Sequence, residues 1–110
     1  MLAVDTVRGD VIPAMVQRIV ERFDPLRIIL FGSYARGDEG RHSDVDLLVV
    51  MAWVTDQRKV TVEIRNTLAH FPVPKDVIVT TLDEIARYGN RVGMVLRPAL
   101  REGKVLYERT

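Results

Sequence analysis

Residues 26–51, LRIILFGSYARGDEGRHSDVDLLVVM, decide the fold of this chain. The two ends of the stretch, 26–31 and 44–51, are short runs rich in aliphatic residues, which is typical of buried strands. Between them, residues 32–43 are polar and contain three glycines. This middle segment therefore predicts a loop, with one helical turn at 34–36, that joins two strands.

The flanking sequence predicts further helices and strands. Apolar residues at three- and four-residue spacings indicate a first helix that begins at an Asp10 N-cap, has Pro13 in its first turn and ends at Asp24-Pro25. After residue 51 we expect a helix that is capped by Thr55 or Asp56 and runs to about residue 69, then a strand at 76–81 and a helix at 82–88. A helical segment at 92–102 follows, which Pro98 kinks or restarts and Gly103 ends. The last expected element is a short strand at 105–107. Because no repeat or linker divides the sequence, we expect a single domain over residues 1–110.

The composition excludes several classes of function. The 110 residues are 47% hydrophobic and 28% charged, carry a formal net charge of +1 and include no cysteine. Without cysteine there is no disulfide, no thiolate metal site and no cysteine nucleophile. The sequence has no signal peptide and no apolar run that could cross a bilayer, so we expect a cytoplasmic protein without a membrane partner. The near-neutral charge gives no reason to expect direct binding of nucleic acid.

An acidic pair opens the second predicted strand. Asp44 and Asp46 are two residues apart, and such residues on a strand point to the same face. Two carboxylates held that close are unfavourable unless a cation lies between them. Sites made of carboxylate oxygens suit Mg²⁺ or Mn²⁺, which then usually bridge to the phosphates of a substrate.

The polar groups around this pair indicate phosphate chemistry. Gly32 lets a backbone N–H approach a phosphate closely, and the Ser33 hydroxyl adds a donor. Ser43 is a third candidate for phosphate binding, although a hydroxyl at such a position more often binds the loop backbone than a substrate. If the strand at 76–81 lies beside the second strand, Asp76 joins the acidic pair as a third carboxylate. Three carboxylates can hold two metal ions about 3.5–4 Å apart for in-line displacement at phosphorus, with Asp76 nearest in role to the general base.

Each of these residues also has an ordinary structural interpretation. An aspartate at a strand start can simply be solvated, a Gly-Ser pair can form a turn, and Asp76 can be a turn residue after Pro74. The sequence also leaves open whether Trp53, just after the second strand, is buried or is an exposed anchor for a partner.

The same residues resemble a known family. GSYARG, the ten-residue gap and SDVDLLV are similar to the Gly-Ser-x10-Asp-x-Asp signature of the DNA polymerase β superfamily of nucleotidyltransferases, and the whole chain resembles the minimal nucleotidyltransferases (MNT). The resemblance implies an α/β (α+β) two-layer fold, with a small mixed sheet and helices packed mainly on one face. It also implies transfer of a nucleoside monophosphate, AMP from ATP, with two Mg²⁺ ions, or Mn²⁺, held by Asp44, Asp46 and Asp76. Gly32 and Ser33 would then hold the triphosphate.

The resemblance further implies a partner. MNT proteins commonly pair with a HEPN protein in toxin–antitoxin modules and add AMP to a tyrosine of that toxin. Two alternatives stay open: an antitoxin that neutralises its partner by contact alone, and an enzyme that modifies a small molecule such as an aminoglycoside. The last alternative generally needs a further domain to hold the acceptor, for which 110 residues leave no room.

Overall fold

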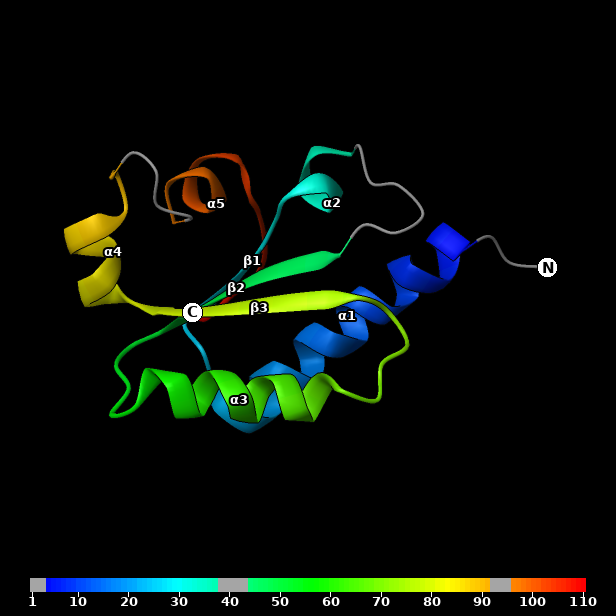
Figure 1. Cartoon of the computed structure of the whole chain (residues 1–110), viewed down its shortest axis with the longest axis horizontal. Coiled ribbons are helices and arrows are strands. Elements are labelled where there is room, and N and C mark those ends of the chain that lie inside the picture. Colours follow the sequence, from blue (N-terminus) through cyan, green and yellow to red (C-terminus); the bar gives the residue numbers. More distant parts are fainter. Residues whose placement is uncertain (1–3, 38–43, 92–95) are drawn as a thin grey trace.

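The computed structural model describes residues 4–37, 44–91 and 96–110. These ranges contain five helices and four strands (Figure 1). In chain order they are α1 (Val4–Phe23), β1 (Arg27–Phe31), α2 (Ser33–Arg36), β2 (Val45–Met51), α3 (Gln57–Leu68), β3 (Lys75–Thr81), α4 (Leu82–Tyr88), α5 (Leu96–Glu102) and β4 (Lys104–Glu108). Ser43 and the segment 92–95 lie outside the described residues.

The four strands form one mixed sheet in the order β3-β2-β1-β4, which confirms the predicted mixed sheet. β1 runs antiparallel to both β2 and β4, whereas β2 and β3 are parallel. Parallel neighbours need a crossover connection, and α3 provides it. The third strand therefore lies beside the second, which was the condition for Asp76 to join the acidic pair.

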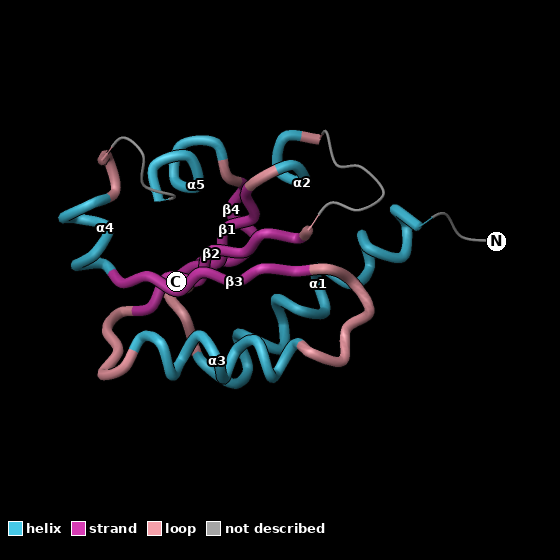
Figure 2. Tube along the Cα trace, in the orientation of Figure 1, coloured by secondary structure: helices cyan, strands magenta, loops and turns pink. Residues whose placement is uncertain are grey.

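Helices cover both faces of the sheet, whereas the family resemblance implies helices mainly on one face (Figures 1 and 2). The two longer helices, α1 and α3, pack on one face, where Ile19, Leu47 and Ile64 belong to the larger core cluster. The shorter α4 and α5 pack on the other face, where Leu48 and Leu96 belong to a second, smaller cluster. Side chains alternate along a strand, so neighbours such as Leu47 and Leu48 enter different clusters.

Helix termini follow the expected local chemistry, with one correction. Asp56 caps α3 by accepting a hydrogen bond from the Lys59 amide (3.1 Å), as one of the two predicted caps. The predicted start of the first helix was wrong, because α1 begins at Val4 rather than after Asp10. Pro13 therefore lies inside the helix and removes a backbone donor there. The helix continues through Pro13 because the apolar face beyond it packs on the sheet.

The C-terminal elements match the expectation in outline. Within the described residues α5 spans Leu96–Glu102 and includes Pro98, which has no backbone N–H to donate. Gly103 follows directly, and its amide donates to the Ala99 carbonyl (3.0 Å). The final strand extends over Lys104–Glu108 and pairs with β1.

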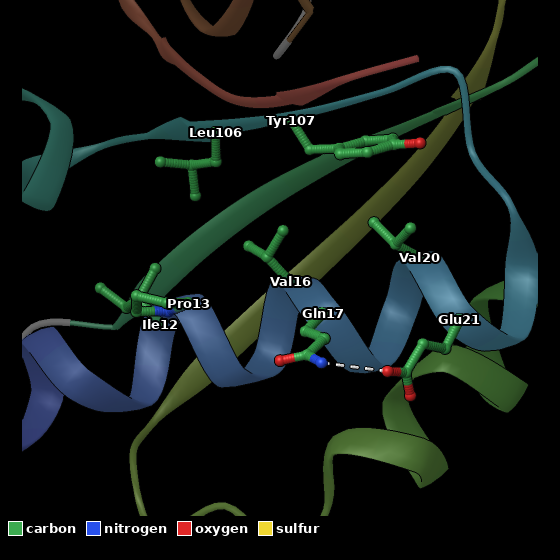
Figure 3. A pocket seen from close by; sticks show the side chains of 8 residues that line it. All are labelled: Ile12, Pro13, Val16, Gln17, Val20, Glu21, Leu106 and Tyr107. Atoms are coloured by element: carbon green, nitrogen blue, oxygen red, sulfur yellow. Dashed lines mark hydrogen bonds between the residues drawn. The ribbon is translucent and has the colours of Figure 1, made fainter. Parts of the chain in front are cut away.

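The register between β1 and β4 shifts at Ile28/Ile29, which is a β-bulge. Consecutive side chains normally point to opposite faces, but Leu106 and Tyr107 both line a groove against α1 (Figure 3). This apolar groove has a volume of about 360 Å³, and none of the candidate site residues lines it. Trp53 lies elsewhere, after β2, and is 75% exposed, so the alternative that it is buried is wrong.

No helix among the described residues is both long and apolar enough to cross a membrane.

Candidate functional site

Two of the predicted carboxylates meet at one end of the sheet. Asp46 is the second residue of β2 and Asp76 is the second residue of β3, and the parallel register pairs them directly. Side chains of paired residues in a sheet point to the same face. Asp44 immediately precedes β2 and is exposed. The three carboxylates therefore come from the starts of two adjacent parallel strands (Figure 1).

Gly32 packs directly against the Asp46 carboxylate. The antiparallel register pairs Phe31 with Asp46, so the residue after Phe31 passes beside that side chain. Gly32 has φ +75°, and a Cβ built on it would collide with Oδ2 of Asp46. From the sequence, phosphate binding alone gives a functional explanation for a glycine at position 32. The structure adds a second reason, because any side chain at position 32 would displace the candidate cation ligand.

Ser33 starts the short helix α2 at the end of β1, as expected for a donor at a strand-to-helix turn. The Gly32 carbonyl accepts hydrogen bonds from the amides of Ala35 (3.1 Å) and Arg36 (3.2 Å), which fixes this turn. Ala35 is buried in the larger core cluster. The turn that carries Gly32 and Ser33 is therefore held by backbone hydrogen bonds to Gly32 and by the burial of Ala35 in the core.

The electrostatics of Asp46 favour a bound cation. Burial raises the pKa of Asp46 above its ordinary value of 3.8, and the neighbouring carboxylates of Asp76 and Asp44 raise it further. Arg36 opposes this effect and lowers the pKa. A carboxylate that is half-buried beside two others is poorly stabilised in its ionised form, and a divalent cation would supply the missing positive charge.

Asp76 has a cationic partner that sequence reasoning missed. Nη2 of Arg65, on α3, donates to Oδ1 of Asp76 at 3.0 Å and to the Val77 carbonyl at 3.2 Å. Nothing in the spacing of Arg65 and Asp76 indicates this pair, because it depends on how α3 packs beside β3. The crossover of α3 between two parallel strands is the only sequence signal that could have suggested such a contact.

As positioned, no three Asp, Glu or His side chains of the described ranges converge closely enough to hold a metal ion. The donor chemistry nevertheless suits Mg²⁺ or Mn²⁺: the groups are carboxylates, they repel one another, and Gly32 leaves room for the Asp46 carboxylate. Asp44, Asp46 and Asp76 thus stay predicted ligands, with Arg65 bonded to one of them.

Comparison with known proteins supports the nucleotidyltransferase interpretation. Residues 12–103 match the family described as "Nucleotidyltransferase domain". The chain is 33% identical over 90 residues to the "Putative protein adenylyltransferase MJ1305" of Methanocaldococcus jannaschii. That alignment covers 80% of this chain and 53% of the relative, so the chain spans about half of the relative's length.

Solved structures of the same fold include a "putative nucleotidyltransferase" from Sulfolobus solfataricus (TM-score 0.63, 20% identity, covering 91% of this chain and 79% of that one). They also include the toxin–antitoxin MntA-HpeT (TM-score 0.59, 21% identity, 88% and 72% covered). A third is a toxin–antitoxin with AMP-PNP (TM-score 0.55, 20% identity, 89% and 74% covered). At these identities the similarity shows the fold, and it confirms the expected fold class.

Proposed function

The chain belongs to the nucleotidyltransferase domain family, and from this premise we propose that it transfers AMP from ATP to a hydroxyl group of a partner protein. The observation that carries the proposal is the pairing of Asp46 with Asp76 on adjacent parallel strands, beside a glycine that has no room for a side chain. A purely structural role would not explain why Asp44 and Asp76 lie where they raise the pKa of Asp46.

The proposed reaction is an in-line displacement at phosphorus. The acceptor hydroxyl oxygen forms a bond to the α-phosphorus of ATP, and the bond from that phosphorus to the bridging oxygen of pyrophosphate breaks. The hydroxyl proton passes to the Asp76 carboxylate, and the products are the AMP ester and pyrophosphate. Gly32, Ser33 and Ser43 bind the triphosphate through backbone and hydroxyl donors.

Asp44, Asp46 and Asp76 would hold two Mg²⁺ ions, for which Mn²⁺ can substitute. When bound, such ions activate the attacking hydroxyl and neutralise the charge of the leaving pyrophosphate. The residues of this chain provide the oxygen ligands, Gly32 leaves room for the Asp46 carboxylate, and Arg36 adds a positive charge close to it.

The partner we propose is a HEPN-family toxin with a tyrosine as the acceptor, so that the chain acts as an antitoxin. Support comes from the toxin–antitoxin complexes among the structures of the same fold, one of which contains AMP-PNP. A separate partner also suits the described residues, which form little beyond one sheet with its covering helices.

Transfer can be tested directly with ATP labelled at the α-phosphate, Mg²⁺ and a candidate HEPN-family partner protein. We expect labelled partner with the wild-type chain and a loss of at least about 100-fold with Asp46→Asn. Asp83→Asn is the matched control, because Asp83 is an exposed carboxylate on α4 that pairs with Arg87. Label transfer that survives Asp46→Asn would contradict the assigned site.

A double variant separates the proposal from an antitoxin that acts by contact alone. If Asp44→Asn with Asp46→Asn still neutralises the toxin at full strength, contact is sufficient and transfer is not the function. Transfer to a panel of hydroxylated small molecules, but not to the protein, would instead indicate a small-molecule enzyme.

A further inference from the structure

Arg65 bonds to a carboxylate that the proposed reaction needs for a cation and for a proton. Its Nη2 lies 3.0 Å from Oδ1 of Asp76, and the two side chains are 55% and 46% exposed. Exposed pairs of this kind exchange readily with solvent and contribute little to stability. The Arg65 contact with Asp76 can therefore open at low energetic cost.

The guanidinium is also held in position from the other side. The same nitrogen donates to the Val77 carbonyl at 3.2 Å, on the strand residue that follows Asp76. Arg65 thus has a second partner that does not depend on Asp76. A side chain with two partners can release one and keep the other, so opening the ion pair does not require α3 to move.

We propose that Arg65 is an internal counterion that competes with divalent cations for Asp76. In the cation-free protein Arg65 neutralises Asp76 and holds it away from a common position with Asp44 and Asp46. When a cation binds the three carboxylates, Arg65 releases Oδ1 and keeps its bond to Val77. This inference rests on the proposed function, because it assumes that the three carboxylates bind a cation.

Electrostatics gives the direction of the effect. A positive charge 3.0 Å from one ligand opposes the binding of a second positive charge at that ligand. Removal of the guanidinium charge should therefore strengthen cation binding, whereas a residue that only positions Asp76 should weaken cation binding when it is lost. The counterion role and the positioning role of Arg65 therefore predict changes of opposite sign in cation affinity when the guanidinium is removed.

The test measures Mn²⁺ binding by the full chain without nucleotide or partner, from the EPR signal of free Mn²⁺. We expect Arg65→Gln to bind Mn²⁺ about 5- to 50-fold more tightly than wild type, in the range of typical coupling between sites. Arg65→Lys keeps the charge and should bind within about threefold of wild type. The matched control is Arg58→Gln, which removes the same charge from an exposed position of the same helix and should change the affinity by less than about twofold.

A second readout does not depend on affinity. In the cation-free protein we expect the NMR chemical shift of the Arg65 guanidinium to differ from that of a solvated arginine and to change when Mg²⁺ is added, because the bond to Asp76 opens. Asp46→Asn should abolish that change, since the cation then lacks a ligand.

Failure of this inference differs from failure of the proposed function. If Asp46→Asn abolishes Mn²⁺ binding but Arg65→Gln binds no more tightly than Arg58→Gln, the competition is wrong and the cation site stands. Weaker binding by Arg65→Gln would make Arg65 a positioning residue and also overturn the proposal. If Asp46→Asn does not change Mn²⁺ affinity in any background, both the cation site and the counterion role of Arg65 are wrong. The labelled-ATP assay then decides whether transfer occurs.

Discussion

At the scale of single residues, Gly32 links the backbone to the candidate chemistry. Its φ of +75° already disfavours other residues, and its missing side chain leaves the space that Asp46 Oδ2 occupies. We expect Gly32→Ala to lower transfer and Mn²⁺ affinity by at least about tenfold, because the new methyl group must displace the carboxylate. The affinity can be measured by EPR and the transfer with labelled ATP.

Gly37 offers a matched control for this substitution. Gly37 has φ +78° and ψ 14°, in the left-handed region that other residues adopt at a modest cost, whereas Gly32 has φ +75° and ψ −155°, a conformation essentially restricted to glycine. No described atom lies within 4 Å of the position that a Cβ on Gly37 would take. Gly37→Ala should lose about 1–2 kcal/mol of stability from backbone strain, and Gly32→Ala should lose more than Gly37→Ala. Only Gly32→Ala should lose cation binding, and equal losses in the two variants would contradict the role given to Gly32.

Asp46 makes the stability of the cation-free protein depend on pH. Because its pKa is raised in the folded state, chiefly by burial and then by Asp76 and Asp44, the folded protein binds this proton more tightly than the unfolded chain. The resulting stabilisation is fully present below the unfolded pKa of 3.8 and is lost as pH rises through the folded pKa. At neutral pH the ionised carboxylate therefore destabilises the fold.

We expect Asp46→Asn to raise Tm at pH 7 in EDTA by a few degrees, roughly 2–5 °C. The difference should shrink as pH falls through the raised pKa of Asp46, because the wild-type carboxylate then takes up its own proton. Thermal unfolding followed by circular dichroism at several pH values measures this difference, with Asp83→Asn as the control that should not raise Tm. A lower Tm for Asp46→Asn at pH 7 would show that other interactions of the carboxylate outweigh the repulsion.

At the scale of elements, the edge strand β3 is covered by side chains of α3. Arg65 donates to the Val77 carbonyl, and Gln57 donates to the Val79 carbonyl two residues further along. Alternate carbonyls of an edge strand face outward, and unpaired ones invite pairing with another chain. Gln57 also contacts the Glu84 carboxylate, which accepts a short bond (2.6 Å) from the buried Thr80 hydroxyl. The crossover helix α3, which connects β2 to β3, thus also covers the outer edge of β3.

The order of the elements could be predicted from the sequence, because their signals are local. The apolar runs indicated β1 and β2, Pro25 indicated the end of α1, and Asp56 indicated the start of α3. The start of α1 could not be predicted, because Pro13 is usually a first-turn residue and only packing on the sheet carries the helix through it. Local sequence signals therefore predict which elements exist. They predict less well where an element begins or ends when tertiary contacts extend it.

The candidate site was predictable only in part for the same reason. The spacing of Gly32, Asp44 and Asp46 lies within one loop and one strand, so the sequence displays it. The ion pair of Arg65 with Asp76, and the contact of Gly32 with Asp46, depend on sheet register and on the position of α3. Sequence patterns identify the residue types, whereas their partners follow from tertiary structure.

The junction between α5 and β4 gives a prediction at this scale. A Cβ on Gly103 would collide with the Ala99 carbonyl oxygen and with Ile29 Cγ2, both parts of the packed fold. We expect Gly103→Ala to destabilise the protein by roughly 2–4 kcal/mol, because backbone and core must shift together. Urea unfolding measures the change, and the exposed neighbour variant Lys104→Ala should stay within about 0.5 kcal/mol of wild type. Tolerance of alanine at position 103 would mean that α5 can move away from β1.

At the scale of the whole molecule, the two core clusters share the central strands. Val49 belongs to the cluster under α1 and α3, and Val50 belongs to the cluster under α4 and α5, although the two residues are neighbours on β2. Both are essentially inaccessible to solvent. A disturbance on either face therefore reaches β2, which also carries Asp46. This arrangement favours the proposal that residues 1–110 form one domain and unfold as a unit.

We expect Val49→Ala and Val50→Ala to lower the stability of the same single transition, each by roughly 1–3 kcal/mol. Far-ultraviolet circular dichroism and the NMR signals of α3 and α5 should give coincident urea midpoints in both variants, since neither face can be lost without β2. If Val50→Ala instead lowers the midpoint for α5 alone and leaves that of α3 unchanged, the face under α4 and α5 unfolds independently. The candidate site would then depend only on the larger cluster, because β2 and β3 would keep Asp46 opposite Asp76 without the smaller one.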